Sequence, residues 1–415
     1  MEYRTEFEKL SRKIDSDIPR VKKFLENSRK IAVIPHWDSD GLASAVLFLC
    51  AAKRRDTPCT VILPEIGHYG ITQGVKERLE VSECDHVFLT DKELQKEEMK
   101  RVKDVAKEIL IIDHHDIPYG DEISKNVIVI NPKFYEAKIN TPAGLLAYIT
   151  LEKIYPEIKK AIHLAAIGAY CDYAEKELDF FIEERIFSIY PSLKGKIFRP
   201  KNEKDISACV PRKLSRIVTS AYFHSLKDGA YTAIQALEKS IEEEDPLTIL
   251  YGRDEDSRKL VEWDAEMRFE PLPKQPVEKY YHQLAKANRL IFDKFIYTEV
   301  NVPYALGLEI GKRLSKKYQR SAFVLNSFDY KLANVLLNGY ISDALKSTDF
   351  RSISKKVAHQ LGAEWFGSEY TCSIEVPTWN AKNIVGALCS TFQKIGAEES
   401  RPGSHPTPYA STSSS

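Results

Sequence analysis

The sequence has no long hydrophobic run, no closely paired cysteines and no excess of charge of either sign. No apolar stretch reaches the ~18 residues that would predict a membrane span, so we expect no membrane contact. The seven cysteines form no CxxC pair, which argues against a disulfide framework and against a zinc knot. The beginning of the chain lacks the basic and apolar regions of a secretory signal. We therefore expect a reducing, cytoplasmic setting.

The charges of the chain cancel, because it has 60 basic and 60 acidic residues. A protein that coats duplex DNA neutralises many phosphates, so the zero net charge disfavours that class. A local basic groove remains compatible with this balance, and Arg212, Lys213 and Arg216 are one candidate for it. An ordinary solvated helix face is the simpler interpretation of such a run.

The length and the hydrophobic pattern predict an α/β protein of more than one domain. A chain of 415 residues is too long for one ordinary core. Short apolar runs alternate with helical patterns in the first part, which is typical of βαβ units and a parallel sheet. We expect strands at 30–35, 60–63, 86–90, 108–112 and 127–130. We also expect Thr141 to cap a helix that begins near Pro142.

The expected division has three parts. Residues 1–190 would form the N-terminal parallel-sheet domain, 191–285 a helical insert and linker, and 286–415 a smaller C-terminal α/β domain. The Pro-rich stretch at 271–276 is typical of a linker.

Acidic and imidazole side chains follow several of the expected strands. His36, Asp38 and Asp40 alternate after the first run, so that they can converge on one point. Further candidates are Asp91, the triplet Asp113-His114-His115, and Asp172, which closes an apolar helix. In parallel sheets, ligands collect outside the carboxyl ends of the strands. Asp91 or Asp172 taken alone would more often cap a helix or form a turn.

The number and kind of these side chains predict two metal ions. Carboxylates mixed with imidazoles suit manganese, iron or zinc better than calcium. Four carboxylates and at least two histidines exceed what one ion needs, whereas two ions about 3.5–4 Å apart would use them all.

The combination of HxDxDG at 36–41 with DHH at 113–115 resembles the DHH phosphoesterases. The resemblance implies a DHH catalytic domain, with His36, Asp38, Asp40, Asp91, His114 and Asp172 as ligands of two divalent ions, manganese or magnesium. It places Asp91 between the ions and His115 beside the scissile phosphate. Asp113 would orient the histidines from behind.

The same family has a C-terminal DHH-associated domain that ends in a glycine-rich GGGH loop. The corresponding stretch is Arg401-Pro402-Gly403-Ser404-His405, and the resemblance implies that Arg401, Gly403, Ser404 and His405 contact the substrate. Pro402 and Ser404 replace two glycines of the loop, and proline removes a backbone donor from a phosphate nest. A polar tail that stays unfolded is the alternative interpretation.

Within the superfamily, the chain resembles archaeal RecJ-like nucleases, including the GINS-associated type. This resemblance implies a metal-dependent exonuclease that degrades single-stranded DNA or RNA from an end. One alternative is an enzyme similar to the nano-RNases and pAp phosphatases, which acts on short oligonucleotides. The other is a replisome component that binds GINS and has a mainly structural role. The complete set of ligands argues against a purely structural role.

Overall fold

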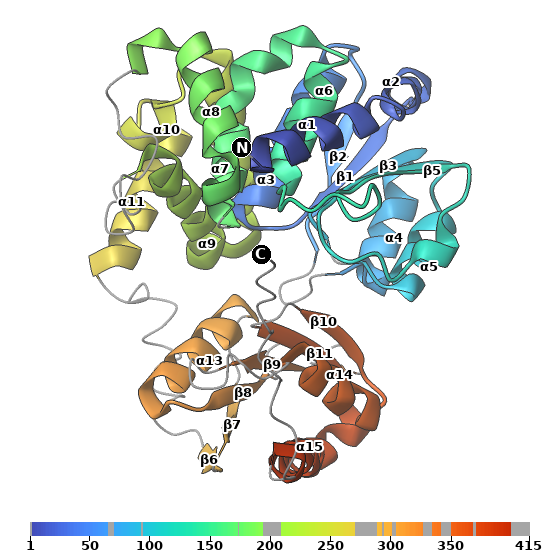
Figure 1. Cartoon of the computed structure of the whole chain (residues 1–415), viewed down its shortest axis with the longest axis vertical. Helices are drawn as coiled ribbons and strands as arrows, with labels where there is room; N and C mark the ends of the chain where they lie inside the picture. Colours follow the sequence, from blue (N-terminus) through green and yellow to red (C-terminus); the bar gives the residue numbers. More distant parts are fainter. Residues whose placement is uncertain are drawn as a thin grey trace, which may run out of the picture. The chain divides into compact units, whose positions relative to one another are not determined.

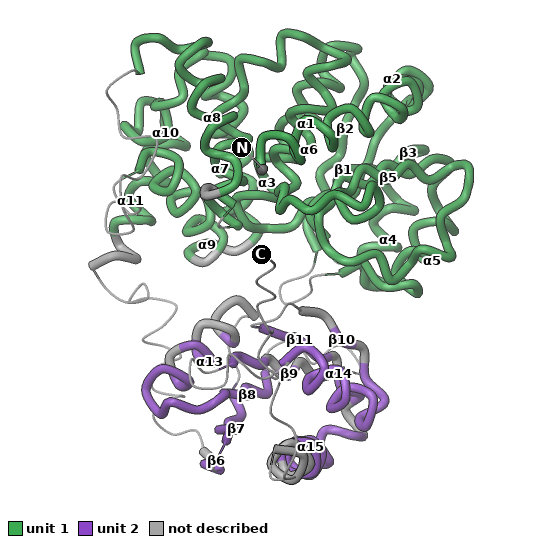
Figure 2. Tube along the Cα trace, in the orientation of Figure 1, with its two compact units in different colours: residues 1–279 green, residues 280–415 purple. Residues whose placement is uncertain are grey.

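A computed structural model of the chain divides it into two compact units, residues 1–279 and 280–415 (Figure 2). The structure describes residues 2–64, 70–92, 94–172, 174–193, 209–269, 289–292, 294–300, 304–326, 334–341, 350–367 and 371–399. Helices α9 to α11, which belong to the expected insert, are grouped with the first unit. The three-part division at 190 and 285 stays a prediction.

The first unit contains a parallel sheet in the strand order β2–β1–β3–β4–β5 (Figure 1). Its strands are β1 (Ile31–Pro35), β2 (Cys59–Val61), β3 (His86–Thr90), β4 (Glu108–Ile112) and β5 (Val127–Ile130). The first, third and fourth strands of the chain are therefore neighbours, so their carboxyl ends lie side by side. The predicted fold class, an α/β chain with an N-terminal parallel sheet, is confirmed.

The strands are apolar throughout because helices cover both faces of the sheet. One face packs against α4 (Gln73–Ser82) and α5 (Lys96–Lys103) through residues such as Val87 and Leu89. The intervening Phe88 points to the opposite face, where its ring stacks on Phe48 with 4.0 Å between centroids. Phe48 belongs to α3 (Ser39–Lys53), and it also contacts Phe24 of α2 (Ile18–Asn27).

Helices α3, α6 (Ala143–Glu152) and α7 (Ile162–Cys171) pack against one another beside the sheet. The prediction that Thr141 caps α6 is wrong. The cap position is Pro142, and no side chain at that position accepts a helix amide. The amides at the start of α6 instead donate to Asp40, a residue 103 positions earlier. The chain enters α7 through a 3₁₀ helix, Pro156–Ala161.

Pro19 interrupts the amphipathic pattern of the first 30 residues, as its fixed geometry predicts. The helix α1 (Glu2–Ile14) ends before it, and Pro19 itself lies in the first turn of α2. The helical end of the first unit comprises α8 (Glu175–Ile189), α9 (Val210–Glu242), α10 (Thr248–Tyr251) and α11 (Glu255–Phe269). In the part of the chain that the structure describes, no helix is both long and apolar enough to cross a membrane.

Helix α9 is bent near its middle. A Cβ atom added at Gly229 would lie 1.8 Å from the carbonyl oxygen of Ala221, although eight residues span about 12 Å in a straight helix. Gly229 therefore permits a backbone contact that no other residue would allow.

The second unit has a mixed sheet in the order β10–β11–β9–β8–β7–β6. Only β7 and β8 pair in parallel among these neighbours. The strands are β6 (Arg289–Ile291), β7 (Phe295–Val300), β8 (Ser321–Asn326), β9 (Asn334–Tyr340), β10 (Glu364–Gly367) and β11 (Thr371–Pro377). Its helices are α13 (Tyr304–Tyr318), α14 (Phe350–Gln360) and α15 (Ile384–Glu399). Phe295, Phe323 and Phe392 contact one another in the core of this unit.

Candidate metal centre

Three of the predicted site residues stand at equivalent positions of neighbouring strands. His36, Asp91 and Asp113 directly follow β1, β3 and β4. The sheet ladder continues through them, because the amide of His36 donates to Thr90 O, that of Asp91 to Ile112 O and that of Asp113 to Ile130 O, each at 3.1 Å. The strand register therefore brings the three residues to one edge of the sheet, as their order in the sequence predicts.

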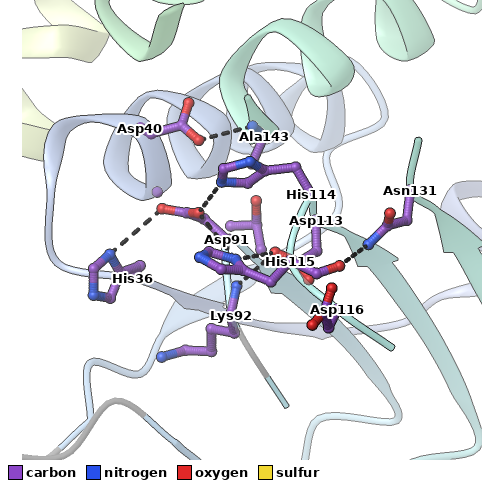
Figure 3. A network of polar contacts seen from close by, with 12 residues as sticks. His36, Asp40, Asp91, Lys92, Asp113, His114, His115, Asp116, Asn131 and Ala143 are labelled. Carbon is purple, nitrogen blue, oxygen red and sulfur yellow. Dashed lines mark hydrogen bonds and ion pairs between the residues drawn. The ribbon is translucent and has the colours of Figure 1, made fainter. Parts of the chain in front are cut away.

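Asp91 lies at the centre of this edge and is 2% exposed. Its Oδ2 atom is 3.4 Å from Nδ1 of His36, and its Oδ1 atom is 3.3 Å from Nε2 of His114 (Figure 3). The backbone of Asp91 has a φ of 56°, in the left-handed region that residues other than glycine rarely adopt. Such strain persists where surrounding structure enforces it, and it is common at functional sites.

Asp38 supports the start of α3 and also faces the centre. Its Oδ1 atom accepts the amide of Gly41 at 3.0 Å, which makes Asp38 the N-cap of the helix. Its Oδ2 atom is 3.0 Å from Nδ1 of His36. His36, Asp38 and Asp91 each offer a ligand atom within 4.8 Å of the others.

Asp40 lies between α6 and α7. Its carboxylate accepts the amides of Ala143 at 2.7 Å and Gly144 at 2.8 Å, where the positive end of the α6 dipole favours an anion. Cβ atoms added at Gly144 and Gly168 would lie 3.0 Å and 2.1 Å from Asp40 Oδ1. The two glycines therefore form a notch for this buried carboxylate.

Asp172, at the end of α7, completes a second group. Its Oδ2 atom is 2.9 Å from Nε2 of His114. Asp40, Asp91, His114 and Asp172 each offer a ligand atom within 4.8 Å of the others. The structure thus brings together all six predicted metal ligands, in two groups that share Asp91.

Asp113 is fully buried and belongs to neither of these two ligand groups. Its Oδ1 atom is 2.8 Å from Nδ1 of His115 and accepts the amide of Lys92 at 3.1 Å. The side chain of His115 is 34% exposed, and Asp91 Oδ1 lies 3.8 Å from its Nδ1 atom. Asp113 therefore fixes the orientation of an imidazole at the rim of the centre.

Burial and mutual repulsion set the protonation of the cluster. Burial would lower the pKa of His36, but the Asp38 and Asp91 carboxylates outweigh it and raise the pKa to about 9. Burial, with the charges of Asp91 and Asp172, raises the pKa of Asp40 well above its usual range. Burial would also raise the pKa of Asp91, but hydrogen bonds from His114 and His36 hold it well below its usual range.

The donor set fits divalent cations. Four buried or half-buried carboxylates, Asp38, Asp40, Asp91 and Asp172, converge with imidazole nitrogens, and buried carboxylates are costly unless cations compensate them. Oxygen and nitrogen donors of this kind suit manganese, iron or zinc.

Sequence reasoning missed three neighbours of the centre. Asn131 follows β5 at the same sheet edge, and its Nδ2 atom donates to the carbonyl of His115 at 3.0 Å; the strand-then-polar pattern could have found it. Lys92 is 2% exposed, and burial lowers its pKa to about 8. Cys171 offers its thiol within 4.8 Å of ligand atoms of Asp38 and Asp172. No sequence signal distinguishes Cys171 from the other cysteines of the chain.

The remaining predicted residues fall into two sets. Arg401, Gly403, Ser404 and His405 lie outside the described residues. Arg216 pairs with Asp264 at 2.8 Å, and Arg212 donates to the carbonyl of Tyr170. These two arginines thus have partners inside the first unit.

Comparisons with known proteins give a family match for part of the chain and the fold of the whole. Residues 30–169 match the model of the DHH family, N-terminal domain. No curated protein matches the chain.

Three solved structures share the fold. One is the DHH domain of a member of a family of ribosomal proteins, with 18% identity, a TM-score of 0.60 and coverage of 94% of this chain and 92% of that one. Exonuclease RecJ bound to manganese has 13% identity and a TM-score of 0.60, with 94% and 95% covered. CDC45 from Entamoeba histolytica has 11% identity and a TM-score of 0.54, with 92% and 99% covered. Residues 30–169 therefore match a DHH-family N-terminal domain, and the chain has a RecJ-like DHH fold.

Proposed function

We propose that the chain is a two-metal phosphodiesterase that degrades single-stranded DNA or RNA from one end. The observation that carries this proposal is the carboxylate of Asp91, whose two oxygens face different groups. Oδ2 faces His36 and Oδ1 faces His114. A carboxylate placed in this way suits a bridge between two ions.

The two groups assign the ligands. One ion would be held by His36, Asp38 and Asp91, and the other by Asp40, Asp91, His114 and Asp172, since each group brings its ligand atoms within 4.8 Å. A pair of divalent ions supplies an activated water and charge stabilisation for both the attacking and the leaving oxygen of a phosphodiester. Manganese or magnesium would serve, and manganese suits the histidine nitrogens better.

His115 is assigned the contact with the substrate phosphate. Its Nδ1 atom is engaged by Asp113 at 2.8 Å, so Nε2 is the atom that would donate to a phosphate oxygen. Burial would lower the pKa of His115, but the Asp113 carboxylate raises it above the usual value. An imidazole N–H at the rim would stabilise negative charge that develops on the phosphate.

The choice of an exonuclease rests on the likeness in fold to exonuclease RecJ over nearly the whole chain. Single-stranded nucleic acid is then the partner, and a reducing cytoplasm the setting. The likeness to CDC45 supports a second candidate, a replisome component that binds GINS. The complete ligand set favours hydrolysis over that role.

Long single-stranded DNA and RNA, labelled at either end and incubated with Mn²⁺ or Mg²⁺, would test the proposal. The informative variant is Asp38→Asn, because asparagine retains the cap on Gly41 N but removes the charge. Asp116→Asn is the matched control, since Asp116 pairs with Lys133 at 2.6 Å and belongs to neither ligand group.

We expect the wild type and Asp116→Asn to shorten the strands progressively from one end, and Asp38→Asn to leave them intact. Cleavage confined to dimers through pentamers would indicate the short-oligonucleotide enzyme instead. No cleavage, with binding to GINS unaffected by Asp38→Asn, would indicate the structural role.

A further inference from the structure

The loop 36–39, which carries His36 and Asp38, packs against the first half of α9. Ser39 opens α3 and is fully buried, so its amide has no partner within the helix. That amide donates to Oγ1 of Thr219 at 3.2 Å. The Ser39 hydroxyl is 2.8 Å from the hydroxyl of Ser215. Two polar groups of one loop residue thus bind side chains 176 and 180 positions later.

An aromatic contact holds the other end of the loop. The ring of Trp37 stacks on that of Tyr222, with 4.6 Å between centroids and 16° between planes. Trp37 is 7% exposed and Tyr222 is 3% exposed. The Trp37 ring in turn contacts that of His36, with 4.8 Å between centroids. The stack therefore reaches a predicted metal ligand.

The residues that contact the loop form one stripe of α9. Ser215, Thr219 and Tyr222 are spaced i, i+4 and i+7, which places them on the same face of a helix. Tyr222 also lies at the bend of the helix, where the Ala221 carbonyl approaches Gly229.

An ion pair between half-buried Arg216 and a buried carboxylate of α11 fixes α9 from another side. Asp264 of α11 is 1% exposed and receives Nε and Nη2 of Arg216 at 2.8 Å and 3.3 Å. Its Oδ1 atom also accepts the hydroxyl of Ser220 at 3.3 Å. Arg216 and Ser220 are again four positions apart, so α11 holds one stripe of α9 while another stripe contacts the loop.

We propose that the first half of α9 is a positioning element for the metal-binding loop, with Ser215, Thr219 and Tyr222 as positioning residues. Leu214 and Val218 are buried apolar residues of α9 that pack the same half of the helix. The polar stripe adds directional contacts that fix Ser39 and Trp37, and these flank Asp38. The inference rests on the proposed metal centre, and it makes this part of the helical segment a component of that centre.

The test compares Thr219→Val with Thr232→Val. The first removes the acceptor for Ser39 N and keeps a similar side-chain volume. The second is its control on the same helix, because the Thr232 hydroxyl donates to Asp228 O. Hydrogen exchange of the peptide 36–44 is measured in the full chain without metal, and the dissociation constant of Mn²⁺ is measured by the loss of its free-ion EPR signal.

We expect Thr219→Val to speed exchange in 36–44 and to weaken Mn²⁺ binding by about 10-fold, the usual effect of a group that supports a metal ligand. Thr232→Val should match the wild type in both. If Thr219→Val does not fold, Ser215→Ala is measured in the same way with the same expectation.

An unchanged exchange rate or an unchanged dissociation constant would overturn the positioning role, whatever the nuclease assay shows. If Thr219→Val changes both the exchange rate and the dissociation constant, the positioning role is supported. If the wild type in addition hydrolyses no nucleic acid, only the proposed function is refuted.

Discussion

Asp91 is the residue around which the candidate metal centre is arranged. It is nearly fully buried, it has a left-handed backbone, and its carboxylate lies within 3.4 Å of imidazole nitrogens on both sides. Its side chain is the shared member of both ligand groups. The two-metal centre therefore depends on the negative charge of this one carboxylate.

Asp91→Asn should therefore abolish both metal binding and hydrolysis. The amide has nearly the same shape, but it lacks the charge that two ions would share. We expect the rate of strand degradation to fall by at least about 100-fold, measured at saturating Mn²⁺. Asp116→Asn, in the same segment but in neither ligand group, should retain the wild-type rate. Retained activity in Asp91→Asn would remove the bridging role.

The notch around Asp40 gives a prediction about stability. Gly168→Ala would place a Cβ atom 2.1 Å from Asp40 Oδ1, so α7 or the carboxylate must move. We expect the free energy of unfolding in urea to fall by about 1–3 kcal/mol. The control is Gly120→Ala, because a Cβ there meets no heavy atom within 4 Å. It should change the value by less than about 0.5 kcal/mol. If the two substitutions lower the free energy of unfolding equally, the close packing of Asp40 against Gly168 is contradicted.

The residues at the strand ends were predictable because their positions depend on the order of neighbouring residues in the sequence. An apolar run followed by an acidic or imidazole side chain places that side chain at the ligand-binding edge of a parallel sheet. This pattern located His36, Asp91 and the 113–115 triplet. The contacts of Asp40 with α6 and of Ser39 with α9 were not predictable. They join residues more than 100 positions apart, and no local pattern encodes such a partner.

At the scale of elements, the helices beside the sheet are joined by buried polar contacts. His163 of α7 lies 2.8 Å, at Nε2, from the hydroxyl of Ser240 in α9. That hydroxyl donates to Leu237 O at 2.7 Å, so the imidazole is the donor in this pair. Burial lowers the pKa of His163 to about 3, and the ring is neutral in the folded protein.

This neutral imidazole makes stability depend on pH. The unfolded chain binds a proton at His163 below pH about 6.5, whereas the folded chain does so only near pH 3. The free energy of unfolding therefore falls as the pH falls through this window, by up to about 1.4 kcal/mol per pH unit. His163→Gln retains a donor but has no titration. Urea denaturation between pH 6.5 and 5 should show a steeper fall in the free energy of unfolding for the wild type than for His163→Gln. If the free energies of the two proteins fall in parallel, His163 is not the residue responsible.

The bounds of helices and strands were predicted best where the local hydrophobic pattern is strongest. The expected strands at 86–90, 108–112 and 127–130 coincide with β3, β4 and β5, because each is a short apolar run of strand length. Helix α4 and the short strands β6 and β10 were missed. The last two have three and four residues, too few for a periodic signal. The cap of α6 was misassigned because a distant carboxylate, rather than the preceding threonine, satisfies its amides.

At the scale of the whole molecule, the described ligands all belong to the first compact unit. Metal binding should therefore stabilise that unit selectively. At a free Mn²⁺ concentration 100 times the dissociation constant, the expected gain is about 2.7 kcal/mol per site. Hydrogen exchange should slow in β3 and β4 and stay unchanged in β7 and β8. Equal protection of both units by Mn²⁺ would contradict a centre confined to residues 1–279.

The central claim is that the two ligand groups that share Asp91 hold two ions. Anomalous diffraction from crystals grown with Mn²⁺ tests this claim most directly. We expect two anomalous peaks about 3.5–4 Å apart, one near His36 and Asp38 and the other near His114 and Asp172, with Asp91 between them. A single peak, or no peak at this edge of the sheet, would contradict the two-metal account.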